Sequence, residues 1–193
     1  MNKKITTLIA QIISLLFGPI IIPLLLIIIL FNSGLKNQQI FYLLPITLIL
    51  LIGIPYGYIV YAIKNKSISD IDITKREQRF GVMLITIISA FISLISVYFL
   101  GNQLSFYLYL LIFIILVVNS LITLFWKISL HMTANIIMAI IINFLLHWQY
   151  PILFITIPLI FWSRLYLKKH TFMQLLVALI LNGGIAMLFL SRI

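Results

Sequence analysis

Long apolar runs separated by short polar stretches dominate the pattern of this chain. Runs bounded by Asn, Gly, Pro or charged residues predict seven helices, at about 5–31, 40–63, 80–100, 104–126, 130–147, 151–168 and 171–190. Crossing the roughly 30 Å hydrocarbon core of a bilayer takes about 20 apolar residues. The pattern therefore predicts an all-α, polytopic membrane helix bundle of six to seven transmembrane helices, which forms a single domain over residues 1–193.

Two features of the apolar runs bear on this prediction. The first run follows Lys3 and Lys4 as in a signal peptide, but it continues to Phe31 without a small-residue cleavage site, so we expect it to remain as the first span. Prolines lie inside several runs, and neighbouring membrane helices can satisfy the carbonyl groups that proline frees. We therefore expect kinks rather than helix ends at these prolines, which are Pro19, Pro23, Pro45, Pro55 and Pro158.

Composition narrows the classes of protein. Hydrophobic residues make up 64% of the chain and charged residues 8%, which excludes a soluble domain because too little polar surface is present to cover the core. The net charge of +10 is compatible with a nucleic-acid partner, but the basic residues lie between apolar runs, where they orient the chain and meet anionic headgroups. The absence of cysteine excludes disulfides and thiolate chemistry. We therefore expect membrane lipids, and no nucleic acid, as partners.

The distribution of basic residues predicts an orientation. If the chain crosses seven times, the polar segments 64–79, 127–131 and 164–170 all lie on the side of the N-terminus. Every Lys and Arg except Lys36 and Arg192 then lies on that side. By the positive-inside rule, we expect an integral protein of the cell membrane whose N-terminus and polar face are cytoplasmic.

The polar segments contain the residue types that phosphoryl transfer needs. Hydrolysis of a phosphomonoester through a covalent intermediate takes a nucleophile, an acid for the leaving oxygen and fixed cations around the phosphate. Two histidines can share the first two tasks without a metal, because a neutral imidazole attacks phosphorus and a protonated one gives a proton. The candidates are His170 and His131.

Candidate phosphate ligands accompany both histidines. Arg164 and Arg79 can contact phosphate oxygens bidentately, Lys75 can act as a point charge, and Ser129 can donate from its hydroxyl group. If Ser129 begins a helix, its free backbone N–H groups, including that of Leu130, add an anion site. Because Ser163 lies seven residues before His170, two helical turns, the pair would share one face of a helix.

Two sequence motifs resemble those of the type 2 phosphatidic acid phosphatase family, membrane lipid phosphatases with a haloperoxidase-like core. The third family motif, SRxxxxxHxxxD, matches Ser163, Arg164 and His170, with Gln174 in the place of Asp. The second, PSGH, corresponds to residues 128–131, in which the serine and the histidine are kept. The resemblance covers about residues 70–175.

The first family motif, KxxxxxxRP, is degenerate in this chain. Arg79 takes the place of the arginine, but Phe80 follows it, and Asp72 stands where the family has lysine. We expect Lys75 or Arg76 to supply that cation from a shifted position.

The resemblance implies a role for each matched residue. His170 would be the nucleophile, His131 the leaving-group acid, and Arg164, Arg79 and Ser129 phosphate ligands, with no metal and no cofactor. The implied activity is hydrolysis of a membrane lipid phosphate or diphosphate, phosphatidate-like or polyisoprenyl, through a phosphohistidine.

The neutral residue Gln174 is the main departure from the family pattern. It can orient the nucleophile but lacks the charge that stabilises an imidazolium, so we expect a slower enzyme or a substitute carboxylate. The only candidates for that carboxylate are Asp70, Asp72 and Glu77. Glu77 or Asp72 can instead pair with the neighbouring arginines.

Other interpretations remain open. Gln174 and the degenerate first motif also suit a weak or inactive protein that binds a lipid phosphate. A prenyltransferase is disfavoured, because the three carboxylates of the chain cannot build two metal clusters. Residues 164–170 can be a basic helix end that lies at the lipid headgroups. Ser129 and His131 can be a polar pair whose hydrogen bonds are satisfied within the helix bundle. His147 can be a residue at the membrane interface. The Asn residues inside the runs are expected to form interhelical hydrogen bonds; they are Asn119, Asn135, Asn143 and Asn182.

Overall fold

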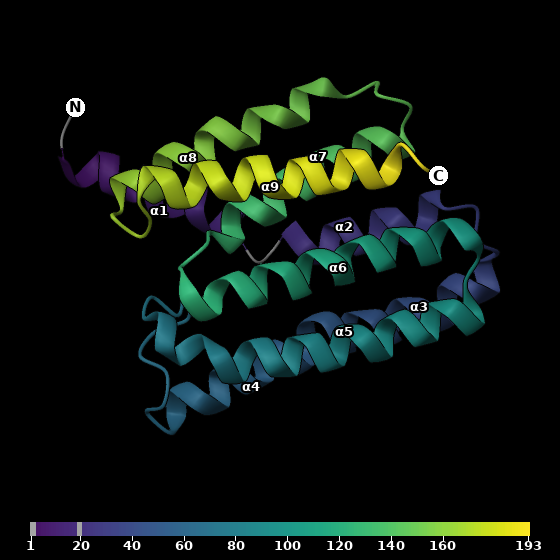
Figure 1. The fold of residues 1–193 in the computed structure, drawn as a ribbon, viewed down its shortest axis with the longest axis horizontal. Coiled ribbons are helices and arrows are strands. Elements are labelled where there is room, and N and C mark those ends of the chain that lie inside the picture. The colour runs from purple at the N-terminus through teal and green to yellow at the C-terminus, as the bar shows by residue number, and fades with distance from the viewer. Residues whose placement is uncertain (1–2, 19–20) are drawn as a thin grey trace. The chain divides into compact units, whose positions relative to one another are not determined.

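Helices and their connections make up the computed structural model, which describes residues 3–18 and 21–193. The α-helices are α1 Lys3–Leu16, α2 Ile21–Asn32, α3 Asn37–Leu48, α4 Ile54–Lys64, α5 Phe80–Leu100, α6 Gln103–Phe125, α7 Leu130–Leu145, α8 Thr156–Tyr166 and α9 Phe172–Leu190 (Figure 1). A π-helical segment, Ile49–Gly53, joins α3 to α4, and 3-10 turns precede α5 and α8. No strand occurs within these described ranges, so the all-α prediction is confirmed.

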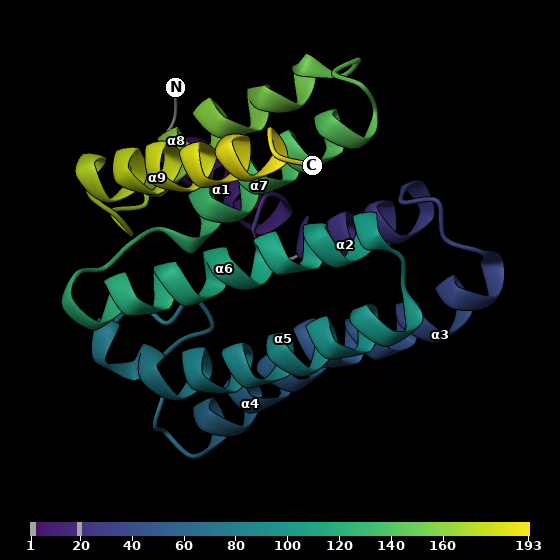
Figure 2. The same cartoon turned by 45° about the vertical axis from the view of Figure 1, so that its right-hand side comes forward.

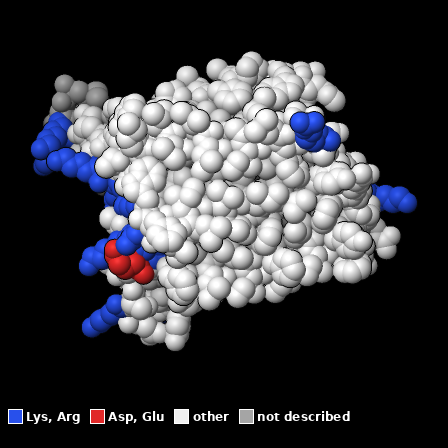
Figure 3. Space-filling model, in the orientation of Figure 1, with Lys and Arg blue, Asp and Glu red and all other residues white. Residues whose placement is uncertain are grey.

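Four helices of the described residues are long and apolar enough to cross a membrane: Asn37–Lys64, Arg76–Leu100, Gln103–Phe125 and Phe172–Leu190. The apolar helices Leu130–Leu145 and Pro151–Tyr166 are shorter. Most atoms on the face drawn in Figure 3 belong to residues that are neither basic nor acidic. These properties suggest membrane association, whereas the number of six to seven crossings stays a prediction.

The expectation of one continuous helix over 5–31 is wrong. α1 ends at Leu16, and the backbone turns at Phe17 and Gly18 before α2 begins at Ile21. Glycine is a poor helix former, and a residue that precedes proline, as Gly18 does, is disfavoured in the α conformation. The expected kink at Pro19 lies outside the described residues.

Proline does not end the second run. The helix continues through Pro45, and a π-helical segment follows before α4. Pro55 lies in the first turn of α4, directly after the π-helical segment, and Pro158 lies in the first turn of α8, directly after a 3-10 turn.

Contacts divide the chain into two compact units. The terminal unit comprises residues 1–25 and 128–193, and the central unit comprises residues 26–127. The expectation of a single domain stays a prediction.

In the terminal unit, α7 is the core helix. It packs against α9 and α8, and α1 packs against α8 (Figures 1 and 2). Nearly every residue from Met132 to Asn143 is buried. Across the α7–α9 contact, Asn182 Nδ2 donates to Thr133 Oγ1 at 2.9 Å. This bond confirms the interhelical role expected for Asn182.

In the central unit, α5 packs against α6, α4 and α3. The connection between α5 and α6 is Gly101 and Asn102, so the two helices are antiparallel neighbours. Asn102 caps α6 by accepting from the Ser105 backbone N–H at 2.9 Å, and its Nδ2 donates to the Ser33 carbonyl at 2.6 Å. The C-terminal end of α6 therefore lies beside the N-terminal end of α5, where the residues of the first motif lie.

Left-handed residues other than glycine follow three helices: Lys66 after α4, His147 after α7 and Lys168 after α8. After α8, the Lys168 N–H donates to the Leu165 carbonyl at 2.9 Å, and the Lys169 N–H donates to the Arg164 carbonyl at 3.0 Å. These two bonds form a Schellman motif, which satisfies the last carbonyls of the helix. The motif reverses the chain immediately before His170, so the expectation that Ser163 and His170 share one face of a helix is wrong: Ser163 lies in α8, which ends at Tyr166, and His170 lies beyond the turn.

Candidate functional site

Three small residues on α1 and just beyond its end form the base of the candidate site. Ala10, Ser14 and Gly18 are spaced four apart, so they lie on one face, and small residues at this spacing let helices approach closely. Two polar contacts join α8 to this face of α1. Ser163 Oγ donates to the Ala10 carbonyl at 2.7 Å, and Arg164 Nη1 donates to Ser14 Oγ at 2.7 Å.

Arg164 carries a positive charge into the interior of the terminal unit. Its side chain is among the largest that are fully buried, with 2% of its surface exposed. A buried charge is tolerated when hydrogen bonds and an opposite charge compensate for lost hydration. Residues 1–25 and 128–193 contain six Lys and Arg and no Asp or Glu, so the field of this unit favours anions.

His131 lies against the other end of the same face of α1. A Cβ atom placed on Gly18 would lie 2.9 Å from His131 Nε2 and 2.5 Å from the Ser14 carbonyl oxygen. The imidazole therefore occupies space that only glycine leaves open. One turn along α7, Asn135 Nδ2 donates to the Phe17 carbonyl at 2.6 Å and to the His131 carbonyl at 2.8 Å. The structure thus brings His131 and Arg164 to one stretch of chain, Ser14–Gly18.

Ser129 is the N-cap of α7, which confirms that a helix begins at this motif. It is fully buried, and its Oγ accepts from the Met132 backbone N–H at 3.4 Å. Leu130 is the first residue of the helix. A hydroxyl group that accepts one hydrogen bond still has a hydrogen to donate, so the cap leaves Ser129 able to bind an oxyanion.

His170 is buried and is held by Gln174. His170 Nδ1 lies 3.2 Å from Gln174 Oε1, which also accepts from the Thr171 backbone N–H at 3.1 Å. In return, the Gln174 N–H donates to Thr171 Oγ1 at 3.3 Å, which completes a capping box at the start of α9. Because the shared oxygen accepts from a backbone N–H, Nδ1 of His170 must donate to it. The lone pair of a neutral ring then lies on Nε2.

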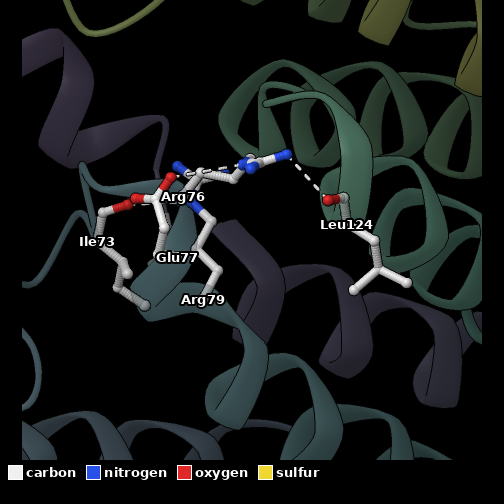
Figure 4. A network of polar contacts seen from close by, with 5 residues as sticks. All are labelled: Ile73, Arg76, Glu77, Arg79 and Leu124. Atoms are coloured by element: carbon white, nitrogen blue, oxygen red, sulfur yellow. Dashed lines mark hydrogen bonds and ion pairs between the residues drawn. The ribbon is translucent and has the colours of Figure 1, made fainter.

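The first-motif residues lie in the central unit and form a polar network of their own (Figure 4). Arg79 is buried, and its Nε donates to the Ile73 carbonyl at 3.0 Å. Arg76 Nη1 donates to the Leu124 carbonyl in the last turn of α6 at 2.9 Å, where a cation also complements the helix dipole. Arg76 Nε lies 3.7 Å from Glu77 Oε1, so the expectation that Glu77 pairs with a neighbouring arginine is confirmed.

A cavity of about 130 Å³ opens beside this network. Its lining combines two guanidinium groups and one carboxylate with apolar side chains; the residues are Arg76, Glu77, Arg79, Phe80, Met83, Thr123 and Leu124. Lys75 is exposed and does not line it. The cavity therefore has a net positive charge and an apolar side. Asp70 instead accepts from Thr74 Oγ1 at 2.9 Å and from Ser69 Oγ at 3.0 Å within its own loop.

The clusters are thus grouped by unit. His131, Arg164, Ser129, His170 and Gln174 belong to the terminal unit, whereas Arg79, Arg76 and Lys75 belong to the central unit. The convergence of the two imidazoles, and of the first-motif cations with them, stays a prediction.

Ser14, Gly18 and Asn135 were not predicted as members of the site. A signal for the first two was present, since Ala10, Ser14 and Gly18 interrupt an Ile- and Leu-rich run at intervals of four. Asn135 follows His131 by one helical turn, which places both on one face. The family resemblance does not reach α1.

The residues gathered here suit an oxyanion, because the donors are guanidinium, imidazole and hydroxyl groups. Within residues 3–18 and 21–193, no group of three or more His, Asp or Glu side chains lies together in a way that could hold a metal ion. No family model matches the chain, and comparison with curated proteins and with solved structures likewise finds no match.

Proposed function

We propose that this chain is a metal-independent phosphatase of a membrane lipid phosphate or diphosphate, resembling the type 2 phosphatidic acid phosphatases. The observation that supports this best is the meeting of Arg164 and His131, from separate sequence clusters, at Ser14–Gly18 of α1. An arginine and a histidine that both reach this stretch of α1 would supply the cation and the proton donor that phosphate ester cleavage needs. The Gln174 contact of His170 supports a role for that ring as the nucleophile.

In the proposed reaction, His170 Nε2 attacks phosphorus and the bond from phosphorus to the lipid oxygen breaks. His131, protonated, gives its proton to that oxygen, so a lipid monophosphate leaves as the alcohol and a lipid diphosphate leaves as the monophosphate. Water then attacks the phosphohistidine, His131 takes the proton, and phosphate leaves with His170 neutral again. Arg164 and Ser129 bind the phosphate oxygens in both steps. Gln174 accepts from Nδ1–H throughout, without the charge that would stabilise the cationic ring.

The apolar helices support a substrate whose tail remains in the bilayer. Ile, Leu and Phe side chains accept an isoprenoid or a glycerolipid chain equally, so the proposal covers phosphatidate-like and polyisoprenyl phosphates. The bias of Lys and Arg along the sequence supports a cytoplasmic active face and N-terminus in the cell membrane.

A second candidate function is binding of a lipid phosphate with weak or no turnover. Two contacts favour it: Gln174 supplies a neutral oxygen where the family has a carboxylate, and Arg76 is held by Leu124 and Glu77. Under this function the anion site is kept while the chemical step is impaired.

Release of phosphate from lipid phosphates in detergent, with EDTA present, tests the proposal. We expect turnover that survives chelation and falls to background in His170→Ala, while His147→Ala, at the left-handed position after α7, keeps wild-type turnover. A strict Mg²⁺ requirement, or full activity of His170→Ala, would contradict it. Tight binding without phosphate release would favour the second candidate.

A further inference from the structure

We infer that Ser14 is a further phosphate-binding residue, whose hydroxyl group donates to one oxygen of the phosphate held by Arg164; the inference rests on the proposed function for the identity of the anion and for its contact with Arg164. Ser14 lies on α1, outside the motif-bearing segment, and 8% of its surface is exposed. Its side chain is therefore enclosed where Arg164 and α1 meet.

The hydrogen-bonding state of Ser14 leaves its hydrogen available to a ligand. A hydroxyl group has one hydrogen to donate and two sites that accept. Ser14 Oγ accepts from Arg164 Nη1 at 2.7 Å, and this is its one recorded hydrogen bond among the described residues. A helical serine commonly donates to the carbonyl one turn earlier, but among the described residues the side-chain hydroxyl that donates to the Ala10 carbonyl is that of Ser163, at 2.7 Å, and not that of Ser14.

Ser14 lies in the stretch of chain, Ser14–Gly18, that both Arg164 and His131 reach. Its hydroxyl contacts Arg164, and its carbonyl lies beside Gly18, at the point that His131 Nε2 approaches. Asn135 fixes the arrangement, because its Nδ2 binds the carbonyls of Phe17 and His131. A phosphate that meets both Arg164 and His131 would meet Ser14.

The chemistry of the pair favours donation to an anion. A guanidinium group that donates to a hydroxyl oxygen polarises its O–H bond and strengthens the next hydrogen bond in the chain. Phosphate offers several acceptor oxygens, so Arg164 and Ser14 can bind different ones. Ser14 then extends the donor set beyond the residues that the family resemblance identifies.

Calorimetric titration of the full chain in detergent with inorganic phosphate, in EDTA, tests this inference. Ser14→Ala is expected to weaken binding roughly tenfold, the value of a hydrogen bond to a charged group. Ser14→Thr, which keeps a hydroxyl group, should bind within about threefold of the wild type. Thr7→Ala is the matched control, because the Thr7 hydroxyl also lies on α1 and also contacts α8, where its Oγ1 lies 3.4 Å from the Tyr166 hydroxyl oxygen, whereas among the described residues it makes no contact with Arg164. This variant should bind phosphate as the wild type does.

A second measurement separates contact with phosphate from an effect through Arg164. If Ser14 contacts the anion, Ser14→Ala still weakens binding in an Arg164→Lys background; if Ser14 only positions Arg164, the added loss disappears and the inference is overturned. Equal phosphate affinity of Ser14→Ala and the wild type, or no phosphate binding by the wild type, also overturns it. Ser14-dependent binding without lipid turnover would leave the inference standing and reject the phosphatase.

Discussion

Gln174 holds His170 through a single side-chain oxygen, 3.2 Å from Nδ1 of the ring. The same oxygen accepts from the Thr171 N–H, so the contact belongs to the capping box that begins α9. The orientation of the proposed nucleophile is therefore built into the start of a helix, while the charge of a carboxylate is missing.

Replacing Gln174 with a carboxylate should raise the rate. The Gln174→Glu variant keeps a side-chain oxygen at the same position. The Gln174→Asp variant has the residue that the type 2 phosphatidic acid phosphatase motif carries there. A charge-assisted hydrogen bond is worth about 1 kcal/mol more than a neutral one, so turnover should rise roughly fivefold to tenfold in at least one variant. The measurement is kcat for lipid phosphate hydrolysis in EDTA. A lower or unchanged kcat in both variants, with wild-type stability, would contradict the role given to Gln174.

Adding a methyl group at Gly18 should disturb the site from the α1 side. In Gly18→Ala the new Cβ meets the Ser14 carbonyl, which is backbone and cannot rotate away, as well as His131 Nε2. We expect a loss of about 1 to 3 kcal/mol in the free energy of unfolding, measured by denaturation in detergent, together with reduced turnover.

Gly184→Ala is the matched control for that experiment. Nothing lies within 4 Å of the position that its Cβ would take. Alanine is the better helix former, so this variant should gain up to about 1 kcal/mol. Equal stability of the two variants would contradict the close approach of His131 to Gly18.

Lys168 offers a way to stabilise the turn before His170. Its φ of 53° is left-handed, which costs a residue with a Cβ about 1 to 2 kcal/mol. Glycine relieves this strain, but its greater freedom in the unfolded chain costs about 0.5 to 1 kcal/mol. The free energy of unfolding of Lys168→Gly should therefore be about 0.5 to 1 kcal/mol higher than that of the wild type. Thermal unfolding measures the change. Lys169→Gly, outside the left-handed region, should lose stability, and a gain there instead of at Lys168 would argue against the Schellman motif.

The orientation in the membrane can be read from the helix Asn37–Lys64. Its 28 residues are long enough to cross a bilayer, so Asn37 and Ser67 should lie on opposite sides. In sealed vesicles of known orientation, an impermeant thiol reagent should label Asn37→Cys from the outside and Ser67→Cys only after the vesicles are opened. External labelling of Ser67→Cys would reverse the proposed topology.

Much of the fold was predictable because short polar connections separate long apolar runs. The limits of α5, α6 and α9 agree within a few residues with the ranges predicted from such boundaries. The break between α1 and α2 was not predicted, because the run of apolar residues continues on both sides of Gly18. Capping of α7 by Ser129 followed from its sequence context, since an N-cap is a local interaction.

The contacts of the site that depend on the packing of helices could not be predicted from the sequence pattern. Ser14 becomes a partner of Arg164 only when α8 lies on α1, and Arg76 reaches Leu124 only when α6 returns beside α5. Both contacts join residues far apart in the chain. Periodicity along one helix cannot identify which distant residue will face it.

Trapping of the covalent intermediate tests the central claim most directly. The purified protein would be mixed with a lipid phosphate in EDTA, quenched at high pH, where phosphohistidine survives, and digested for mass spectrometry. The account predicts a phosphoryl group on the peptide that contains His170, absent in His170→Ala. Steady release of phosphate with an unmodified His170, or a phosphoryl group on another residue, would contradict it.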